Sequence, residues 1–217
     1  EYVKRSILPV SVRRCPRFVG LGATIDYAGN VLLPGEGNMD AAQVLTFWFD
    51  TLEPGDWFGR SDDVDAQIRR QFAECHRAGA AGELYGWRCS PEGRLAEILV
   101  LDQFSRNLYR DDARAFACDA AALVLAQEAI AGGVDDSLSG DQQVFLYMPF
   151  MHSESPRIQR ESLRLFERLG KPTNMDFARR HAEIIERFGR YPHRNAVLGR
   201  HSTPEEQEFL RQPGSSF

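Results

Sequence analysis

Residues 90–108 read SPEGRLAEILVLDQFSRNL, and this segment gives the clearest helix signal in the sequence. Ser90 can cap the helix, and Pro91 suits its first position, where a missing N–H costs nothing. A surface helix would have one apolar stripe, but here apolar residues cover most of the circumference, so we expect this helix to be central and buried. These residues are Leu95, Ile98, Leu99, Leu101, Phe104 and Leu108.

From Asp40 onward the same kind of signal recurs, with helical periodicity between cap residues and Gly or Pro stops. We predict eight helices, with Pro149 ending the fifth, and no strand after residue 39. Because the connections are short, neighbouring helices should be antiparallel. The sequence therefore predicts one all-α domain of antiparallel helical hairpins over residues 39–217. The expected starts are Asp40, Asp62 or Asp63, Ser90, Asp112, the Ser139 capping box, Ser155-Pro156, Thr173 or Asn174, and Thr203.

Residues 1–38 show poor periodicity of either kind and stand apart from this pattern. Met39 directly precedes the first clean helix signal, whereas residue 1 is Glu. We interpret this segment either as an irregular N-terminal extension or as an artefact of a start upstream of the natural one.

The composition is that of a folded soluble protein, with 43% hydrophobic and 26% charged residues. A net charge of -5 argues against a nucleic-acid partner, because phosphate neutralisation needs a basic face. No apolar run approaches the roughly 18 residues that a membrane span needs. Without CxxC spacing, the cysteines are expected to be reduced thiols, which favours a cytoplasmic location. They are Cys15, Cys75, Cys89 and Cys118.

Three polar segments carry a family resemblance: residues 101–107 (LDQFSRN), 147–154 (YMPFMHSE) and 187–195 (RFGRYPHRN). Together with residues 44–49, 56–58 and 202–206, they resemble the bacterial domain-of-unknown-function family 924 over about residues 40–217. The resemblance implies a tetratricopeptide-like α-α superhelix, but it brings no activity. Ser105 departs from the family pattern, which usually has proline there, and this alters the helix end locally.

In the first segment, Asp102 and Arg106 lie four residues apart and share a helix face, as do Gln103 and Asn107. A buried carboxylate must be paired, so we expect an Asp102–Arg106 contact or a bond to another helix. One interpretation is a structural network that fixes helix packing. The other is one wall of a ligand pocket in which Arg106 offers its fork of donors to a carboxylate or phosphate.

The second segment places His152 and Glu154 just beyond Pro149, with Ser153 or Ser155 expected to cap the next helix. Glu154 would then lie near the positive end of that helix.

In the third segment, four polar residues, Arg190, His193, Arg194 and Asn195, crowd a short turn, where structural and functional interpretations are equally open. His181 precedes them on an apolar helix face and is expected to be a hydrogen-bonded core histidine.

Two functional hypotheses follow. The favoured one is binding of a small anion or acidic peptide by Gln103, Arg106, Asn107, Arg190, Arg194 and Asn195 on the concave face of stacked hairpins. The alternative is an enzyme in which His152 or His193 transfers protons beside Asp102 or Glu154, with arginines stabilising charge. A closed pocket with a histidine within hydrogen-bond reach of a carboxylate would favour the enzyme, and an open groove with splayed arginines would favour binding. No cofactor or metal is predicted, because HxxxH and HExxH spacings are missing. The oligomeric state is left open.

Overall fold

The structure, a computed structural model, describes residues 24–25, 31–32 and 40–216 of the 217-residue chain. The chain divides into two compact units, Glu1–Asn38 and Met39–Phe217. In the first unit, β1 (Thr24–Ile25) pairs antiparallel with β2 (Val31–Leu32), with Thr24 opposite Leu32. The prediction that residues 1–38 are an extension or a start artefact otherwise lies outside the described residues.

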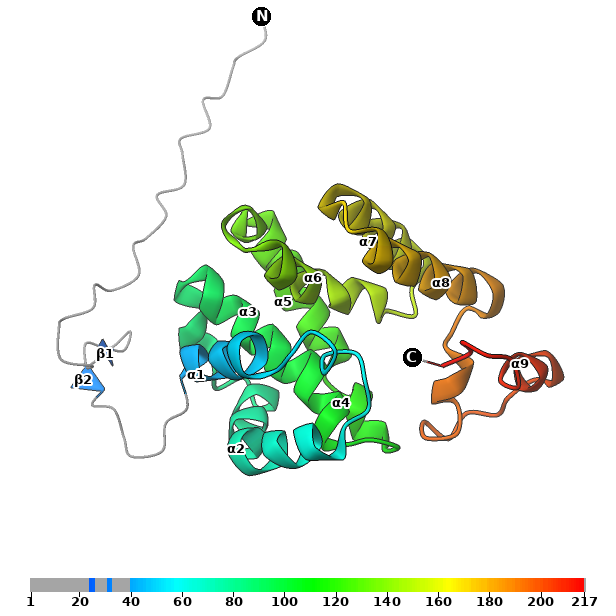
Figure 1. Cartoon of the computed structure of the whole chain (residues 1–217), viewed down its shortest axis with the longest axis horizontal. Helices are drawn as coiled ribbons and strands as arrows, with labels where there is room; N and C mark the ends of the chain where they lie inside the picture. Colours follow the sequence, from blue (N-terminus) through cyan, green and yellow to red (C-terminus); the bar gives the residue numbers. More distant parts are fainter. Residues whose placement is uncertain (1–23, 26–30, 33–39, 217) are drawn as a thin grey trace, which may run out of the picture. The chain divides into compact units, whose positions relative to one another are not determined.

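The second unit is built from helices in the part that the structure describes, residues 40–216, which confirms the all-α class (Figure 1). The finer prediction of a tetratricopeptide-like superhelix stays a prediction. The α-helices are α1 (Ala41–Leu45), α2 (Asp62–Ala80), α3 (Pro91–Leu99), α4 (Ser105–Leu108), α5 (Asp119–Ala131), α6 (Gly140–Met151), α7 (Pro156–Leu169), α8 (Pro172–Phe188) and α9 (Pro204–Phe209). Two π-helical segments (Thr46–Thr51, Val100–Phe104) and four short 3-10 helices (Tyr85–Cys89, Ala113–Phe116, Val134–Ser137, Pro192–Arg194) complete this part.

The predicted caps are present at four helix starts, where Asp40, Ser90, Ser139 and Thr203 each accept a backbone N–H at the starts of α1, α3, α6 and α9. Ser139 and Gln142 form a capping box at α6, and Thr203 and Glu206 form another at α9. In each box the hydroxyl accepts a backbone N–H and the longer side chain accepts the N–H of the cap residue, so two otherwise unpaired donors are satisfied.

Three predicted helix boundaries were wrong. Asp112 does not begin α5: its carboxylate accepts the backbone N–H of Arg114 at 2.9 Å, which closes only the 3-10 turn Ala113–Phe116. Pro149 does not end its helix, because it lies inside α6, close to the end, where it removes one backbone bond from the last turns. Helix α8 begins at Pro172, before Thr173 and Asn174.

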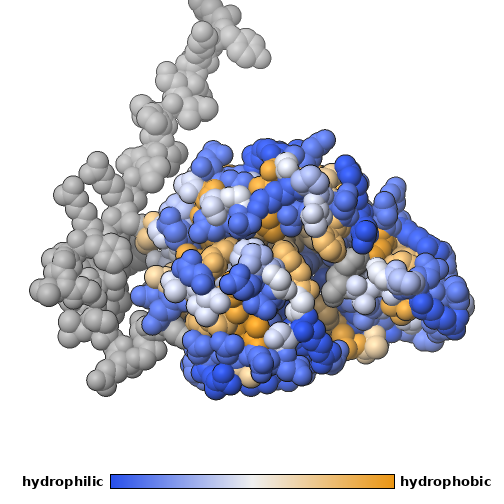
Figure 2. All heavy atoms as spheres, in the orientation of Figure 1, coloured by the Kyte–Doolittle hydropathy of each residue, from blue (hydrophilic) through white to orange (hydrophobic). Residues whose placement is uncertain are grey.

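The predicted central helix is buried, but it is not one continuous α-helix. Every residue from Leu95 to Ser105 is buried, across α3, the π-helical segment Val100–Phe104 and the start of α4. Helix α3 packs against α1, α5 and α6, and α6 in turn packs against the hairpin of α7 and α8 (Figure 1). Figure 2 shows the outer side of these helices as mainly hydrophilic, with hydrophobic residues appearing between them. This packing brings the end of α6 beside the π-helical segment.

None of the helices in the described residues combines the length and the apolar character needed to cross a membrane.

Candidate functional site

The site begins at the π-helical segment Val100–Phe104, where the wider turn buries both Asp102 and Gln103. Such a turn disturbs the regular i to i−4 ladder, and short π-helical segments are frequent at functional sites. The side chain of Ser105 compensates locally, since its Oγ donates to the Leu101 carbonyl at 2.6 Å. The carboxylate of Asp102 is thereby presented to neighbouring helices from inside the core.

Asp102 forms a dyad with His152, the C-cap residue directly after α6. His152 Nδ1 donates to Asp102 Oδ1 at 2.8 Å, and Gln103 Nε2 donates to Asp102 Oδ2 at 2.5 Å. Arg106 Nη1 lies 3.2 Å from Asp102 Oδ1, so the predicted Asp102–Arg106 contact is present. The side chain of Asp102 is only 1% exposed, whereas that of His152 is 14% exposed. The carboxylate is therefore fixed on several sides, and the imidazole lies nearer to solvent.

From this dyad, alternating charges continue through Asp119 and Arg194. Arg106 Nη1 lies 3.0 Å from Asp119 Oδ1, and Arg106 Nη2 donates to Asp119 Oδ2 at 3.2 Å. Arg194 Nη1 donates to the same Asp119 Oδ2, also at 3.2 Å. We call Asp102, Arg106, Asp119, His152 and Arg194 the central polar cluster.

Two aromatic rings contact the guanidinium of Arg194. Its guanidinium carbon lies 4.5 Å from the ring centroid of Phe116 and 4.5 Å from that of Tyr191. Arg106 also lies over Phe116, at 5.7 Å. Such cation–π contacts favour a guanidinium held flat between rings. These contacts restrict how the guanidinium of Arg194 can be approached.

Electrostatics leave the dyad as a carboxylate beside a neutral imidazole. Burial alone would raise the pKa of Asp102, but Arg106, His152 and the hydrogen bonds to the carboxylate hold that pKa well below its usual range. Burial lowers the pKa of His152, and the positive charge of Arg106 lowers it further. With Asp102 accepting from Nδ1, the neutral form of His152 has its lone pair on Nε2.

Two further histidines border the cluster and are neutral at pH 7. Burial lowers the pKa of His181 to about 3 and that of His193 to about 4. His181 Nδ1 donates to the Phe177 carbonyl at 2.8 Å, as expected for a hydrogen-bonded core histidine. The ring of His193 lies 5.6 Å from that of Tyr191, and Asp102 is bonded to His152 rather than to His193.

Of the predicted ligand-binding residues outside the central polar cluster, Gln103 donates to Asp102, whereas the other three bond to residues away from the cluster. Arg190 pairs with Glu206 of α9 through two hydrogen bonds, at 2.7 and 2.8 Å. Asn195 also donates to Glu206, at 3.3 Å. Asn107 donates to Asp65 of α2 at 2.8 Å. Their contacts tie elements together and do not line a common surface with Arg106.

Glu154, a predicted acid–base candidate, anchors the turn that follows α8. It directly precedes Ser155, the N-cap residue of α7, and so lies near the N-terminus of that helix, as expected. Its Oε1 accepts the backbone N–H of Tyr191 at 2.8 Å, and Arg200 pairs with both of its oxygens at 2.6 and 2.9 Å. Arg200 Nη2 also donates to the Tyr191 carbonyl, at 3.1 Å. Ser155 precedes α7 without a side-chain cap bond, whereas Ser153 Oγ accepts the Ser155 N–H at 3.2 Å.

Sequence reasoning missed Asp119, Phe116 and the role of Tyr191. Asp119 lies in no polar motif, and the helix that it begins was expected to start at Asp112. Phe116 sits in the 3-10 turn that replaces the expected helix start. Tyr191 lies inside the quoted segment 187–195, and its hydroxyl donates to the Met151 carbonyl at 2.5 Å. A buried tyrosine needs such a partner, which is a signal that the sequence did contain.

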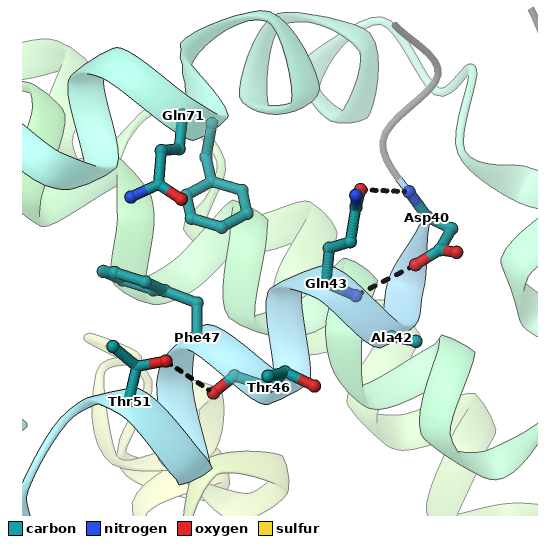
Figure 3. Close-up of a pocket in the computed structure, with 8 residues that line it drawn as sticks. Asp40, Ala42, Gln43, Thr46, Phe47, Thr51 and Gln71 are labelled. Carbon is teal, nitrogen blue, oxygen red and sulfur yellow. Dashed lines mark hydrogen bonds between the residues drawn. The ribbon is translucent and has the colours of Figure 1, made fainter. Parts of the chain in front are cut away.

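Two open hollows lie away from the cluster. One, of about 510 Å³, lies between α2 and the segment formed by α1 and its π-helical continuation, where Gln43, Thr46, Phe47 and Gln71 are among its lining residues (Figure 3). The other, of about 490 Å³, lies among α5, α6 and α7. Neither is lined by a residue of the central polar cluster. Among the described residues, no three His, Cys, Asp or Glu side chains are arranged to hold a metal ion.

Comparison with known proteins identifies the family. The family model described as "bacterial protein of unknown function (DUF924)" matches residues 44–214. The chain belongs to this family. The solved structure of a protein of unknown function from Agrobacterium tumefaciens is 40% identical, with a TM-score of 0.75, over 78% of this chain and 96% of that chain. No curated protein matches the chain. The predicted family resemblance is confirmed, and it assigns no reaction.

Proposed function

We propose that this protein is a hydrolase-type enzyme in which His152, oriented by Asp102, acts as a general base on water. The proposal rests on the 2.8 Å hydrogen bond between His152 Nδ1 and Asp102 Oδ1. A buried carboxylate that accepts from Nδ1 fixes the tautomer, so Nε2 can take a proton. Asp102 then stabilises the imidazolium that forms.

Water is the proposed nucleophile because no hydroxyl or thiol in residues 40–216 is hydrogen-bonded to His152. The partial exposure of the His152 side chain gives Nε2 access to a reactant. Arg106 would supply positive charge beside the reacting group, since its side chain is 21% exposed and already contacts Asp102.

Binding without chemistry has less support. That hypothesis needs Arg106, Arg190 and Arg194 splayed along one surface. Instead, Arg190 is paired with Glu206, while Arg106 and Arg194 converge on Asp119. The histidine–carboxylate contact is one of the two features expected to favour an enzyme, the other being a closed pocket.

The test measures hydrolysis of p-nitrophenyl acetate, p-nitrophenyl phosphate and bis(p-nitrophenyl) phosphate by the full chain. His152→Gln should lower turnover of at least one ester by roughly 100-fold or more, the usual contribution of a positioned base. His201→Asn, at an exposed histidine, is the matched control and should leave turnover unchanged. If no ester is hydrolysed faster by the parent than by His152→Gln, the proposal is wrong.

A further inference from the structure

Asp119 occupies a place suited to an anionic group from outside the protein. Two guanidiniums, those of Arg106 and Arg194, approach its carboxylate from different elements. Proteins also use arginine side chains in this way to bind a carboxylate or phosphate group of a ligand. The Asp119 side chain is 19% exposed, so it lies at the outer edge of the cluster and not within the core.

The contacts that hold Asp119 are long for charge-assisted hydrogen bonds. Both hydrogen bonds to its Oδ2 measure 3.2 Å, compared with about 2.7–2.9 Å for well-formed pairs of this kind. Its Oδ1 lies 3.0 Å from Arg106 Nη1 but makes no hydrogen bond within the described residues. The carboxylate therefore neutralises the arginines without filling their donor geometry.

Arg194 has binding capacity that Asp119 does not use. Its side chain is 7% exposed, and its Nε is buried with no hydrogen-bond partner in the part of the chain that the structure describes. A buried, unpaired N–H costs free energy unless a ligand or water satisfies it. Because Phe116 and Tyr191 both contact this guanidinium, they restrict the directions from which an acceptor can approach it.

The start of α5 adds a further donor group at the same place. Asp119 is the first residue of this helix, and the preceding Cys118 makes no side-chain cap bond. The N-terminus of a helix carries partial positive charge and unpaired N–H groups, which favour an anion nearby.

We infer that the substrate carries a small oxyanion, a carboxylate or a phosphate, which binds Arg106 and Arg194 by displacing the carboxylate of Asp119. This inference rests on the proposed function, because it assigns the substrate class of the His152 site. Displacement keeps the charge balanced, since one anion replaces another beside the two arginines. The ligand would then lie next to His152, which shares Arg106 with Asp119 as an electrostatic neighbour.

The experiment measures binding of inorganic phosphate and of acetate by calorimetry at constant ionic strength. Asp119→Asn removes the internal competitor, so it should bind at least one of the two ions about tenfold more tightly than the parent. Asp112→Asn is the matched control: it removes one negative charge from an exposed pair with Arg114, and its affinity should equal that of the parent. The ion that gains affinity identifies the chemical group.

A second pair of variants tests the arginines in the Asp119→Asn background. Arg106→Lys and Arg194→Lys should each reduce the gained affinity at least tenfold, because a lysine cannot replace the planar fork. Two variants are used because Arg194 is buried, and thermal unfolding checks that each is folded. If Asp119→Asn binds neither ion more tightly than Asp112→Asn does, the inference is wrong.

The two proposals fail separately. His152→Gln should lose hydrolysis but keep the ion affinity of the parent. Loss of hydrolysis in this variant without any gain of affinity in Asp119→Asn would leave the enzyme proposal standing and overturn the substrate class. Ion binding as expected, with hydrolysis unchanged in His152→Gln, would overturn the enzyme proposal.

Discussion

At the scale of single residues, Gly93 in the first turn of α3 has no room for a side chain. A carbon added at its Cβ position would lie 2.0 Å from the backbone oxygen of Trp87. Alanine normally stabilises a helix relative to glycine by about 1 kcal/mol, so the two effects oppose each other. The added carbon would collide with backbone, which cannot move aside as the end of a flexible side chain can. We therefore expect the destabilisation by this collision to exceed the stabilisation by helix propensity.

We therefore predict that Gly93→Ala destabilises the protein by roughly 1–3 kcal/mol, the usual cost of overpacking. Urea unfolding followed by circular dichroism measures the change. Gly86→Ala is the control, because nothing lies within 4 Å of the corresponding position. Equal stability of the two variants would show that α3 can shift away from Trp87.

Asp102 is the residue on which the central polar cluster depends most. Asp102→Asn removes the charge that Arg106 and His152 share, while the amide keeps the shape of the side chain. We expect a loss of roughly 3 kcal/mol in unfolding free energy, as for other buried ion pairs that lose one partner. Asp112→Asn removes an exposed carboxylate from its pair with Arg114 and should change stability little. A loss no greater than that of Asp112→Asn would mean that Asp102 adds nothing to packing.

At the scale of elements, the π-helical segment Val100–Phe104 explains how this chain accommodates serine where its family pattern usually has proline. Ser105 is the first residue of α4, a position that tolerates proline. Its backbone N–H donates to the Gln103 carbonyl, and its hydroxyl donates to the Leu101 carbonyl. Proline would remove both of these bonds, but neither is a regular i to i−4 backbone bond.

Accordingly, Ser105→Pro should fold and lose only about 1–2 kcal/mol, because His76 Nε2 loses the partner that it has at 2.7 Å. Ala96→Pro, inside α3, is the comparison and should cost about 3 kcal/mol or more. Unfolding in guanidinium chloride measures the free energy of unfolding of the two variants. A Ser105→Pro protein as unstable as Ala96→Pro would mean that the backbone at residue 105 needs its N–H.

Elements also show what the sequence could and could not predict. The apolar circumference of residues 90–108 predicted a buried helix, because burial follows from composition alone. The π-helical turn inside it could not be predicted, because it depends on how Asp102 meets His152 from α6. Likewise, the i, i+4 spacing of Asp102 and Arg106 predicted their contact. The partner of Arg194 is Asp119, 75 residues away in the sequence, and only packing brings the two together.

At the scale of the whole molecule, four histidines with lowered pKa values make the stability of the fold sensitive to acid. They are His76, His152, His181 and His193, and burial lowers the pKa of His181 to about 3 and that of His193 to about 4. In the unfolded chain each histidine takes up a proton near pH 6.5, but the folded protein does not. The unfolded state therefore binds more protons below pH 6.5, and stability must fall as the pH falls.

Between pH 6.5 and about 5, the fall of the unfolding free energy with falling pH comes from the histidines. Carboxylates with lowered pKa values, such as Asp102, lose their stabilising contribution only below about pH 4. His181 and His193, with pKa values of about 3 and 4, should each cost up to about 1.4 kcal/mol per pH unit in this window. His181→Asn keeps a donor for the Phe177 carbonyl but cannot titrate, so its slope should be smaller by that amount. The groups facing His181 are His152, His193 and Arg194, and all three remain in this variant. Urea unfolding at four pH values measures the slope, with His201→Asn as the exposed control. If the unfolding free energy of His181→Asn changes with pH as steeply as that of the parent, the folded protein protonates His181 near its ordinary pKa. The conclusion that His181 is neutral in the folded protein would then be wrong.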